Sequence, residues 1–450
     1  MKIRHFTGLL LALFIFASCT PVDIFDDIPA DEAAEYEIIS DQTYDFEEFV
    51  SNMMNGSSIT SGLPDIYKTL ITAAVSSYFD GLKDDNGLKD SKLGFRRITY
   101  SYQSEDQYGN PVTLSAMALW TGGIDGEEWK DIAPDKISLV EHFTITSNEE
   151  CPSEGYPFEA FINGNALVIM PDYIGYGVSS DMIHPYMNHG LCALNSIDAL
   201  SAGAALFDEL SSAGIDKGWK LYVLGASQGG GNALAVHKMM DTDEQLSSKW
   251  RFAGSYCAVG PYDPSLTVDR YMEAGRTDHP VLFPLTLYAM QDSYPEILGK
   301  YDDSDLFSDK YITRKSEIDA ALKSKEYSTS RLNGMLVDFL RNPSGTPGLG
   351  ADELLLEDIL SPVLLDKDSE VCTALYKCLE MNDLTQGWAP QHPIRLYYSE
   401  VDKVVPCDNA LAVYEAFGEE KVTLVKGLQM DHGSSCAMWM LDVLTSGIPF

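Results

Sequence analysis

The chain has 450 residues, of which 45% are hydrophobic and 11% aromatic, so it can bury a large core. Its formal net charge at pH 7 is −37. A chain this acidic repels phosphate backbones, which excludes nucleic acid as an expected partner. Its length allows one large α/β domain with an insertion, or several ordinary domains.

Residues 1–19 have the pattern of an export signal. Two basic residues precede the apolar run 9–16, which is too short to remain in a bilayer as a spanning helix. The run leads into F-A-S-C, which is similar to a bacterial lipobox whose cysteine, here Cys19, becomes the lipidated first residue. Ordinary signal cleavage near Ala17 is the alternative. The sequence thus predicts a cell-envelope lipoprotein anchored in a membrane, and the acidic residues after Cys19 add the hypothesis of surface exposure on the outer membrane.

The next part of the chain predicts a tether and then the start of a sheet. Residues 20–60 are acidic with little sustained apolar pattern, which is typical of a tether. A helix is expected near 66–79, and alternating segments at 97–103 and 112–120 flank Q-Y-G-N-P, which predicts a hairpin.

Strands and helices then alternate along the chain. Strands are expected at 137–140, 166–170, 221–224 and 252–259, and helices at 195–210 and 232–240. The uninterrupted apolar run 166–170 is typical of a buried strand in a parallel sheet. An antiparallel start followed by this alternation predicts a mixed, mostly parallel sheet with helices on both faces, the α/β class.

The pattern changes between residues 263 and 387. Helical segments at 281–290, 315–322 and 331–339 are separated by loops, without a convincing parallel strand. We therefore expect a helical cap at 263–387, inserted in a core made of residues 61–262 and 388–450. The core resumes with strands at 394–398 and 422–425 and helices at 409–417 and 436–444.

The segment K-L-Y-V-L-G-A-S-Q-G-G-G, residues 220–231, carries the pattern G-x-S-x-G at Gly225, Ser227 and Gly229. It lies between an expected strand and an expected helix, which is the context of a nucleophile elbow. The glycines leave room for the strand and helix that pack beside such a turn. The pattern therefore predicts that Ser227 is a nucleophile.

A serine hydroxyl needs a base to take its proton and a carboxylate to orient that base. Sheet hydrolases place these partners in the order serine, acid, histidine. His432 is the only one of the eight histidines that follows the last expected strand. Asp402 follows the preceding strand and is favoured as the acid. Glu400, Asp408 and Asp431 are the alternatives.

A tetrahedral intermediate also needs backbone N–H donors. One is expected from Gln228, directly after the nucleophile, and the other from the loop after strand 137–140. That loop reads His142-Phe143-Thr144, so Phe143 or Thr144 is the candidate for the second donor.

Seven cysteines follow Cys19, an odd number with no C-x-x-C spacing, so no zinc site is expected. Cys407 lies shortly after Asp402, and Cys436 shortly after His432. If the two loops meet, a disulfide between these cysteines would hold the acid and the base together. We treat this pairing as a hypothesis.

Three segments together resemble a known family. G-A-S-Q-G-G at 225–230, P-D-Y-I-G-Y-G at 171–177 and D-H-G at 431–433 are similar to secretory lipases of the α/β-hydrolase superfamily, as is the long insertion before the acid strand. The resemblance covers roughly residues 90–446. It implies an α/β-hydrolase core with a lid and carboxylic-ester hydrolysis without cofactor or metal.

The resemblance also assigns residues. It implies a triad of Ser227, Asp402 and His432, with Asp172 and Tyr173 as structural supports beside the site. The sequence departs from the family at the oxyanion loop, where His142-Phe143-Thr144 replaces the usual His-Gly-Thr.

These observations favour an exported serine esterase or lipase acting on a small-molecule or lipid ester. A serine peptidase of the aminopeptidase type is the main alternative, although no propeller repeat is present to support it. An inert hydrolase-fold lipoprotein that binds a surface is a third possibility, which an intact serine, acid and histidine in the required order disfavours. The acyl length and the alcohol part of the substrate stay open.

Overall fold

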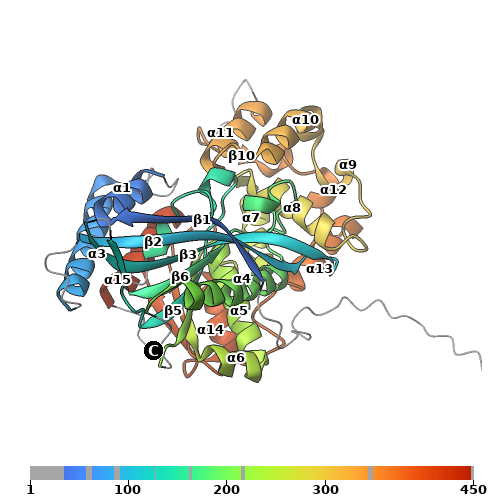
Figure 1. The fold of residues 1–450 in the computed structure, drawn as a ribbon. Coiled ribbons are helices and arrows are strands. Elements are labelled where there is room, and N and C mark those ends of the chain that lie inside the picture. The colour runs from blue at the N-terminus through green and yellow to red at the C-terminus, as the bar shows by residue number, and fades with distance from the viewer. Residues whose placement is uncertain are drawn as a thin grey trace, which may run out of the picture.

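The computed structural model describes residues 35–56, 63–85, 92–126, 128–161, 165–213, 218–342 and 348–446. The expected signal peptide and its lipid-attachment residue Cys19 lie outside these ranges. Helices surround a central sheet on both faces, and a separate group of helices lies beyond one edge of it (Figure 1).

A ten-stranded sheet organises the described residues, in the spatial order β1-β2-β3-β6-β5-β7-β8-β11-β12 with β4 paired to β3. The strands from β1 to β6 in this order pair antiparallel, whereas β6, β5, β7, β8, β11 and β12 run parallel. This arrangement confirms the predicted mixed, mostly parallel sheet. The strands are β1 (Tyr36–Asp45), β2 (Lys92–Glu105), β3 (Pro111–Asp125), β4 (Glu128–Asp131), β5 (Lys136–Glu141), β6 (Ala166–Pro171), β7 (Leu221–Ala226), β8 (Phe252–Ala258), β11 (Ile394–Tyr398) and β12 (Val422–Lys426).

Helices cover both faces of the sheet. One face packs against α4 (His189–Leu210), α5 (Gln228–Thr242), α6 (Glu244–Trp250) and α14 (Asp408–Phe417). The other face packs against α1 (Phe46–Gly56), α3 (Asp65–Asp85) and α15 (His432–Ser446). The strands therefore need apolar side chains on both sides, which explains the continuous apolar runs of the central strands.

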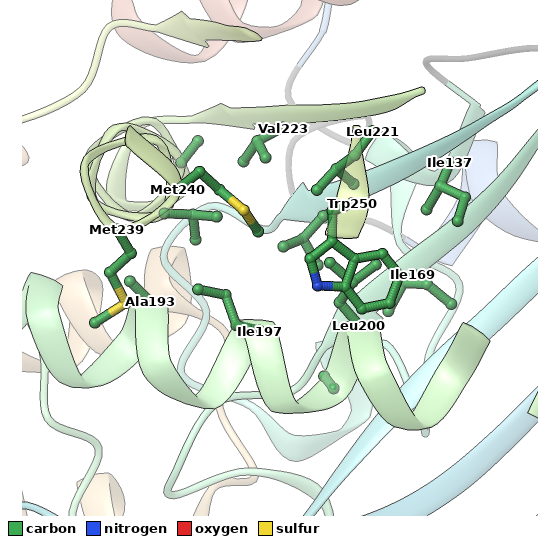
Figure 2. Packing of buried hydrophobic residues seen from close by; sticks show 14 of the residues in the cluster. Ile137, Ile169, Ala193, Ile197, Leu200, Leu221, Val223, Met239, Met240 and Trp250 are labelled. Atoms are coloured by element: carbon green, nitrogen blue, oxygen red, sulfur yellow. The ribbon is translucent and has the colours of Figure 1, made fainter. Parts of the chain in front are cut away.

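The two-residue period of β6 divides its side chains between the two cores. Leu167 and Ile169 pack on the α4 side, and Val168 and Met170 pack on the α15 side. Figure 2 shows the first layer, in which Ile169 lies with apolar residues of α4 and α5. In the described residues, α4 is the one helix long and apolar enough to cross a membrane, but 72% of its apolar window is buried inside the protein. It is therefore the central helix of this core.

The expected tether needs correction, because part of it is ordered structure. Within residues 20–60, β1 forms an edge strand antiparallel to β2, and α1 follows it directly. Most β1 side chains are exposed, so an edge strand tolerates this acidic sequence. In α1 the buried residues Phe49, Val50 and Met53 form a narrow stripe at helical spacing. The many acidic residues make the average polarity of residues 20–60 high, so an average over the segment does not reveal these three buried residues.

The cap has its own hydrophobic core. Its helices are α7 (Pro264–Ala274), α8 (Leu282–Ser293), α9 (Asp303–Leu306), α10 (Asp309–Ser324), α11 (Thr329–Leu340), α12 (Pro362–Leu365) and α13 (Glu370–Glu380). A short antiparallel pair, β9 (Arg276–Thr277) with β10 (Leu354–Leu355), joins them. Tyr186 and Met187, from the segment before α4, pack into this cap core. The cap thus rests on the loops that follow the parallel strands.

Candidate active site

Ser227 lies between β7 and α5 in a strained backbone conformation, with φ 56° and ψ −125°. A Cβ added to Gly225 would lie 2.1 Å from the carbonyl oxygen of Gly229. A Cβ added to Gly229 would lie 2.1 Å from the carbonyl oxygen of Glu141. Only glycine fits at either position, so the G-x-S-x-G spacing is a steric requirement of this turn.

Ser227, His432 and Asp402 meet through two short hydrogen bonds. The Oγ atom of Ser227 is 2.7 Å from Nε2 of His432, and Nδ1 of His432 is 2.7 Å from Oδ2 of Asp402. A carboxylate only accepts, so Nδ1 carries the imidazole proton and Nε2 is free to accept the serine proton. The chain thus brings a nucleophile, a base and an orienting acid into one line.

Two loops hold the acid and the base in place. The Oδ1 atom of Asp402 accepts hydrogen bonds from the N–H groups of Val404 (2.8 Å) and Val405 (3.0 Å), which leaves Oδ2 for the imidazole. The buried hydroxyl of Ser399 donates to the carbonyl of Met430 at 2.8 Å and ties the acid loop to the segment before His432. Nothing in the sequence pattern singled out Ser399.

The alternative acids have other partners. Glu400 forms an exposed ion pair with Lys426 at 2.6 Å. Asp408 pairs with Arg270 at 2.8 Å. Asp431 accepts a hydrogen bond from the N–H of Ser434 at 2.9 Å and caps the first turn of α15. None of these carboxylates bonds to the imidazole of His432.

The expected oxyanion donors have different surroundings. Gln228 is the first residue of α5, so its N–H has no acceptor within the helix. The N–H of Phe143 is donated to Oε1 of the buried Glu159 at 3.1 Å, so it is already engaged. The N–H of Thr144 meets no acceptor among the described residues, and Thr144 lines the same cavity as Ser227. Of the two candidates, Phe143 is therefore corrected to a supporting position and Thr144 remains.

Glu159 is a site residue that sequence reasoning missed. It lies in a short 3-10 segment, Phe158–Phe161, far from any recognisable motif. Burial raises its pKa to about 7, against the opposing hydrogen bond from the N–H of Phe143. Only the tertiary contact reveals that this carboxyl group fixes the oxyanion loop.

The side chain of Gln228 is anchored by a buried histidine. Its amide nitrogen donates to Nε2 of His184 at 2.6 Å, because Nδ1 of that ring donates to the carbonyl of Ile174 at 2.8 Å. Burial lowers the pKa of His184 to about 3, so the ring stays neutral and can accept. This anchor fixes the first residue of α5 and therefore its backbone N–H.

Asp172 and Tyr173 lie beside the site as buried supports. The two carboxylate oxygens of Asp172 accept from the hydroxyl of Ser115 at 2.6 Å and the N–H of Ser153 at 2.8 Å. The hydroxyl of Tyr173 donates to the carbonyl of His142 at 3.3 Å. Asp172 thus ties the loop after β6 to β3 and to the segment at Ser153, and Tyr173 ties it to the first residue of the oxyanion loop.

The hypothetical Cys407–Cys436 disulfide is absent, because all seven cysteines from Cys151 onward are free. Cys436 points into the core between α15 and the sheet, whereas Cys407 is partly exposed at the start of α14. Among the described residues, no group of three or more metal-ligating side chains is placed to hold a metal ion.

A cavity of about 1140 Å³ opens above Ser227, between the core and the cap. Ser227, Gln228, Thr144 and His432 form its floor. Its walls are mainly apolar and come from several cap helices, including Val268 and Met272 from α7, Leu282, Phe283 and Leu287 from α8, Val337 from α11, Leu364 from α12, and Leu375 and Leu379 from α13. Acidic side chains such as Asp338 and Asp352 also line it.

No family model matches the chain, and no curated protein matches it significantly. Similarity appears among solved structures. The rice cell wall degrading esterase LipA from Xanthomonas oryzae superposes with a TM-score of 0.63 at 20% identity, covering 93% of this chain and 96% of that one. A Legionella pneumophila protein superposes with a TM-score of 0.65 at 17% identity, covering 92% and 96%.

These similarities extend over nearly the whole length of the chain, cap included, while the identities are too low to carry more than the fold. Together with the parallel strand order and the elbow at the end of β7, they identify the architecture. The chain has the α/β-hydrolase fold.

Proposed function

We propose that this chain is a serine hydrolase that cleaves carboxylic esters through Ser227, His432 and Asp402. The observation that carries the proposal is the pair of 2.7 Å hydrogen bonds that joins the three side chains at the floor of a cavity. The fold shared with solved esterases supports the same reaction class.

In the proposed reaction, the Oγ atom of Ser227 attacks the acyl carbonyl carbon as Nε2 of His432 takes the hydroxyl proton. The N–H groups of Gln228 and Thr144 donate hydrogen bonds to the developing oxyanion. The imidazolium of His432 then protonates the departing alcohol, and an acyl-enzyme remains on Ser227. Water attacks the acyl-enzyme with His432 as base, and the carboxylic acid and free serine are released.

The apolar walls of the cavity favour an uncharged acyl group. Acidic side chains in the same lining disfavour an anionic substrate, because like charges repel across a poorly hydrated cleft. An ester with an apolar acyl part is therefore the preferred substrate class over a free peptide with a carboxylate close to its scissile bond.

The test is hydrolysis of p-nitrophenyl butyrate and p-nitrophenyl palmitate beside amino-acid p-nitroanilides, with Ser227→Ala as control. We expect ester turnover that falls at least about 1,000-fold in Ser227→Ala, since the triad acts as a unit. A fluorophosphonate probe should label the wild-type protein and leave Ser227→Ala unlabelled. Anilide turnover without ester turnover would replace the proposal with a peptidase, and full activity in Ser227→Ala would overturn the nucleophile.

We further propose that the protein is exported and lipid-anchored through Cys19. Support comes from the sequence of residues 1–19. Membrane fractionation of a native host should find the wild-type chain with membranes and the Cys19→Ala chain in the soluble fraction. Equal membrane association of both chains would contradict the anchor.

A further inference from the structure

Glu141 is a fully buried carboxyl group directly behind the nucleophile elbow. It is the last residue of β5 and pairs in register with Gly225 of β7. Its Cβ would lie 3.0 Å from a Cβ on Gly225, and its carbonyl oxygen would lie 2.1 Å from a Cβ on Gly229. The same residue begins the segment that leads through His142 to the oxyanion loop. Glu141 thus contacts both parts of the site that must be held in register.

A count of protons around Ser196 of α4 indicates which form of Glu141 the structure holds. The Oγ atom of Ser196 is 3.0 Å from Oε2 of Glu141 and 2.8 Å from the carbonyl oxygen of Cys192. A carbonyl and a carboxylate can only accept, and a serine hydroxyl has one proton to give. Both contacts are satisfied only if Glu141 is protonated and donates to Ser196, which then donates to Cys192.

The groups that face Glu141 carry no compensating positive charge. They are Tyr102 of β2, Tyr173 of the loop after β6, Cys192 of α4 and Cys257 of β8. Burial raises the pKa of each of these four groups, so all are neutral in the physiological range. The neighbouring His142 is neutral as well, because burial lowers its pKa to about 4. Oε1 of Glu141 has no hydrogen-bond partner among the described residues.

We propose that Glu141 is a positioning residue whose carboxyl group must stay protonated for the elbow and the oxyanion loop to keep their relative geometry. The proposal rests on the function proposed above. A carboxylate at this position would lose its hydrogen bond to Ser196 or deprive Cys192 of one. It would also place a negative charge among buried neutral side chains that carry no positive charge to compensate it.

The pKa of Glu141 gives the pH range in which its carboxyl group loses the proton. Burial raises the pKa of Glu141 to about 8, against smaller opposing effects of the Tyr173 and Ser196 hydroxyls. The geometry of the N–H groups of Gln228 and Thr144 should therefore loosen as the pH rises through this value. The consequence is an alkaline loss of activity that does not arise from His432.

The experiment compares the wild type with Glu141→Gln, Glu141→Ala and Asp198→Asn. Glutamine keeps a neutral donor for Ser196 and has no proton to lose. Alanine removes the donor. Asp198 is the matched control, because it is another largely buried carboxyl group of this core, hydrogen-bonded to a serine (Ser104, 2.7 Å), whose pKa burial raises to about 6. The readouts are kcat for p-nitrophenyl butyrate and the rate of fluorophosphonate labelling of Ser227, each against pH.

We expect wild-type kcat to fall by about tenfold per pH unit above about pH 8, as a single ionisation requires. Asp198→Asn should keep this limb, and Glu141→Gln should remain flat. Near neutral pH, Glu141→Ala should lose about tenfold or more in kcat, and Glu141→Gln should recover most of that loss. An alkaline limb in Glu141→Gln that overlays the wild type would overturn the proposal.

The labelling rate separates failure of this proposal from failure of the proposed function. If no ester is hydrolysed but labelling shows the same pH pattern, the ester assignment fails and the positioning role stands.

Thermal unfolding gives a third readout. The pKa of Glu141 is about 8 when folded, and that of glutamate is about 4.3 when unfolded. Stability from the bound proton is therefore complete below about pH 4 and lost by about pH 8. The Tm of the wild type relative to Glu141→Gln should fall over this window, and a constant difference would contradict a protonated Glu141.

Discussion

Ser227 is held in a strained backbone conformation with a positive φ of 56°. A non-glycine residue in this region costs of the order of 1–3 kcal/mol, which the surrounding packing must offset. The cost is offset here by a turn in which the N–H groups of Gly230 and Gly231 bond to the carbonyl of Ser227. As a result the hydroxyl is raised from the sheet towards His432 and the N–H of Gln228 is left unused at the helix start.

At the scale of single residues, Asp402→Asn should lower kcat by about 10³ to 10⁴-fold with little change in KM. An amide at this position can donate to Nδ1 of His432, which places the imidazole proton on Nε2, the nitrogen that must accept from Ser227. Steady-state hydrolysis of p-nitrophenyl butyrate measures the effect.

The matched controls for Asp402 are two other acids that follow β11, Glu400 and Asp408. Glu400→Gln and Asp408→Asn remove surface ion pairs with Lys426 and Arg270. Exposed pairs contribute little, so both variants should keep kcat within about twofold of the wild type. If either variant lost most of its kcat while Asp402→Asn stayed active, the orienting acid would be Glu400 or Asp408 and not Asp402.

At the scale of elements, a buried network far from Ser227 holds α5, β8 and the segment before β11 together. The side chain of Asp241 is fully buried and lies 2.9 Å from Nε2 of His237 and 2.5 Å from Nδ1 of His392. His237 in turn bonds to the hydroxyl of Ser255 at 2.7 Å. This network fixes where the chain re-enters the core after the cap, and therefore where β11 delivers Asp402.

Asp241→Asn should lower the free energy of unfolding by about 1.5–3 kcal/mol near neutral pH, because an uncharged amide loses the hydrogen bonds that the buried carboxylate accepts from His237 and His392. Burial opposes ionisation of Asp241, but hydrogen bonds from His237 and His392 prevail and lower its pKa. Since the folded pKa is depressed, this contribution is present above the unfolded value of about 4 and is lost as the pH falls below it. Urea unfolding of both proteins at several pH values gives the difference.

The control for this network is Asp243→Asn. Asp243 caps α6 by accepting from the N–H groups of Gln245 and Leu246 at 2.9 Å, and asparagine caps a helix nearly as well. We expect a change below about 0.5 kcal/mol for this variant. Equal losses in Asp241→Asn and Asp243→Asn, or an Asp241→Asn loss that persists in acid, would contradict the network's role.

At the scale of the whole molecule, the cap and the core share one cavity. The cap contributes most of the apolar wall, and the core contributes the floor with Ser227. The turn between α10 and α11 also bonds to the segment after the oxyanion loop. The N–H of Asn148 donates to the backbone carbonyl of Lys325 at 2.7 Å, and the hydroxyl of Thr146 donates to the backbone carbonyl of Tyr327 at 2.7 Å. If the proposed function holds, we expect the cap to select the substrate and the core to carry out the reaction.

Gly334 of α11 offers a direct test of this division. It lines the cavity, and a Cβ added there would meet nothing within 4 Å. Gly334→Trp should fold, yet it should fill part of the cavity. We expect kcat/KM to fall by about tenfold or more for p-nitrophenyl palmitate and by less than about threefold for p-nitrophenyl butyrate.

Gly334→Ala is the matched variant, since it adds only the methyl group and improves helix propensity by about 0.5–1 kcal/mol. It should keep the wild-type ratio of long- to short-chain activity. An unchanged ratio in Gly334→Trp would show that long acyl chains leave the cavity by another wall.

The sequence predicted the strands and helices of the core well where a local pattern was strong. The apolar run of β6, the hairpin of β2 and β3, and the strand, turn and helix around Ser227 each have a short-range signature. The prediction was wrong at β1 and α1. In these elements the exposed polar side chains outnumber the few buried apolar residues. Glu159, Ser399 and the neutral Glu141 had no local signature, because their partners lie on other elements.

The sequence by itself determined the order of the elements and the residues available for the site, since periodicity and turn chemistry are local properties of the chain. It also narrowed the acid to a few carboxylates after one strand. Only the tertiary structure decided that Asp402 faces His432, that Thr144 rather than Phe143 has an unused N–H, and that Cys407 and Cys436 stay apart. These outcomes depend on which way neighbouring side chains point across a sheet edge, and that direction is set by packing between segments far apart in the chain.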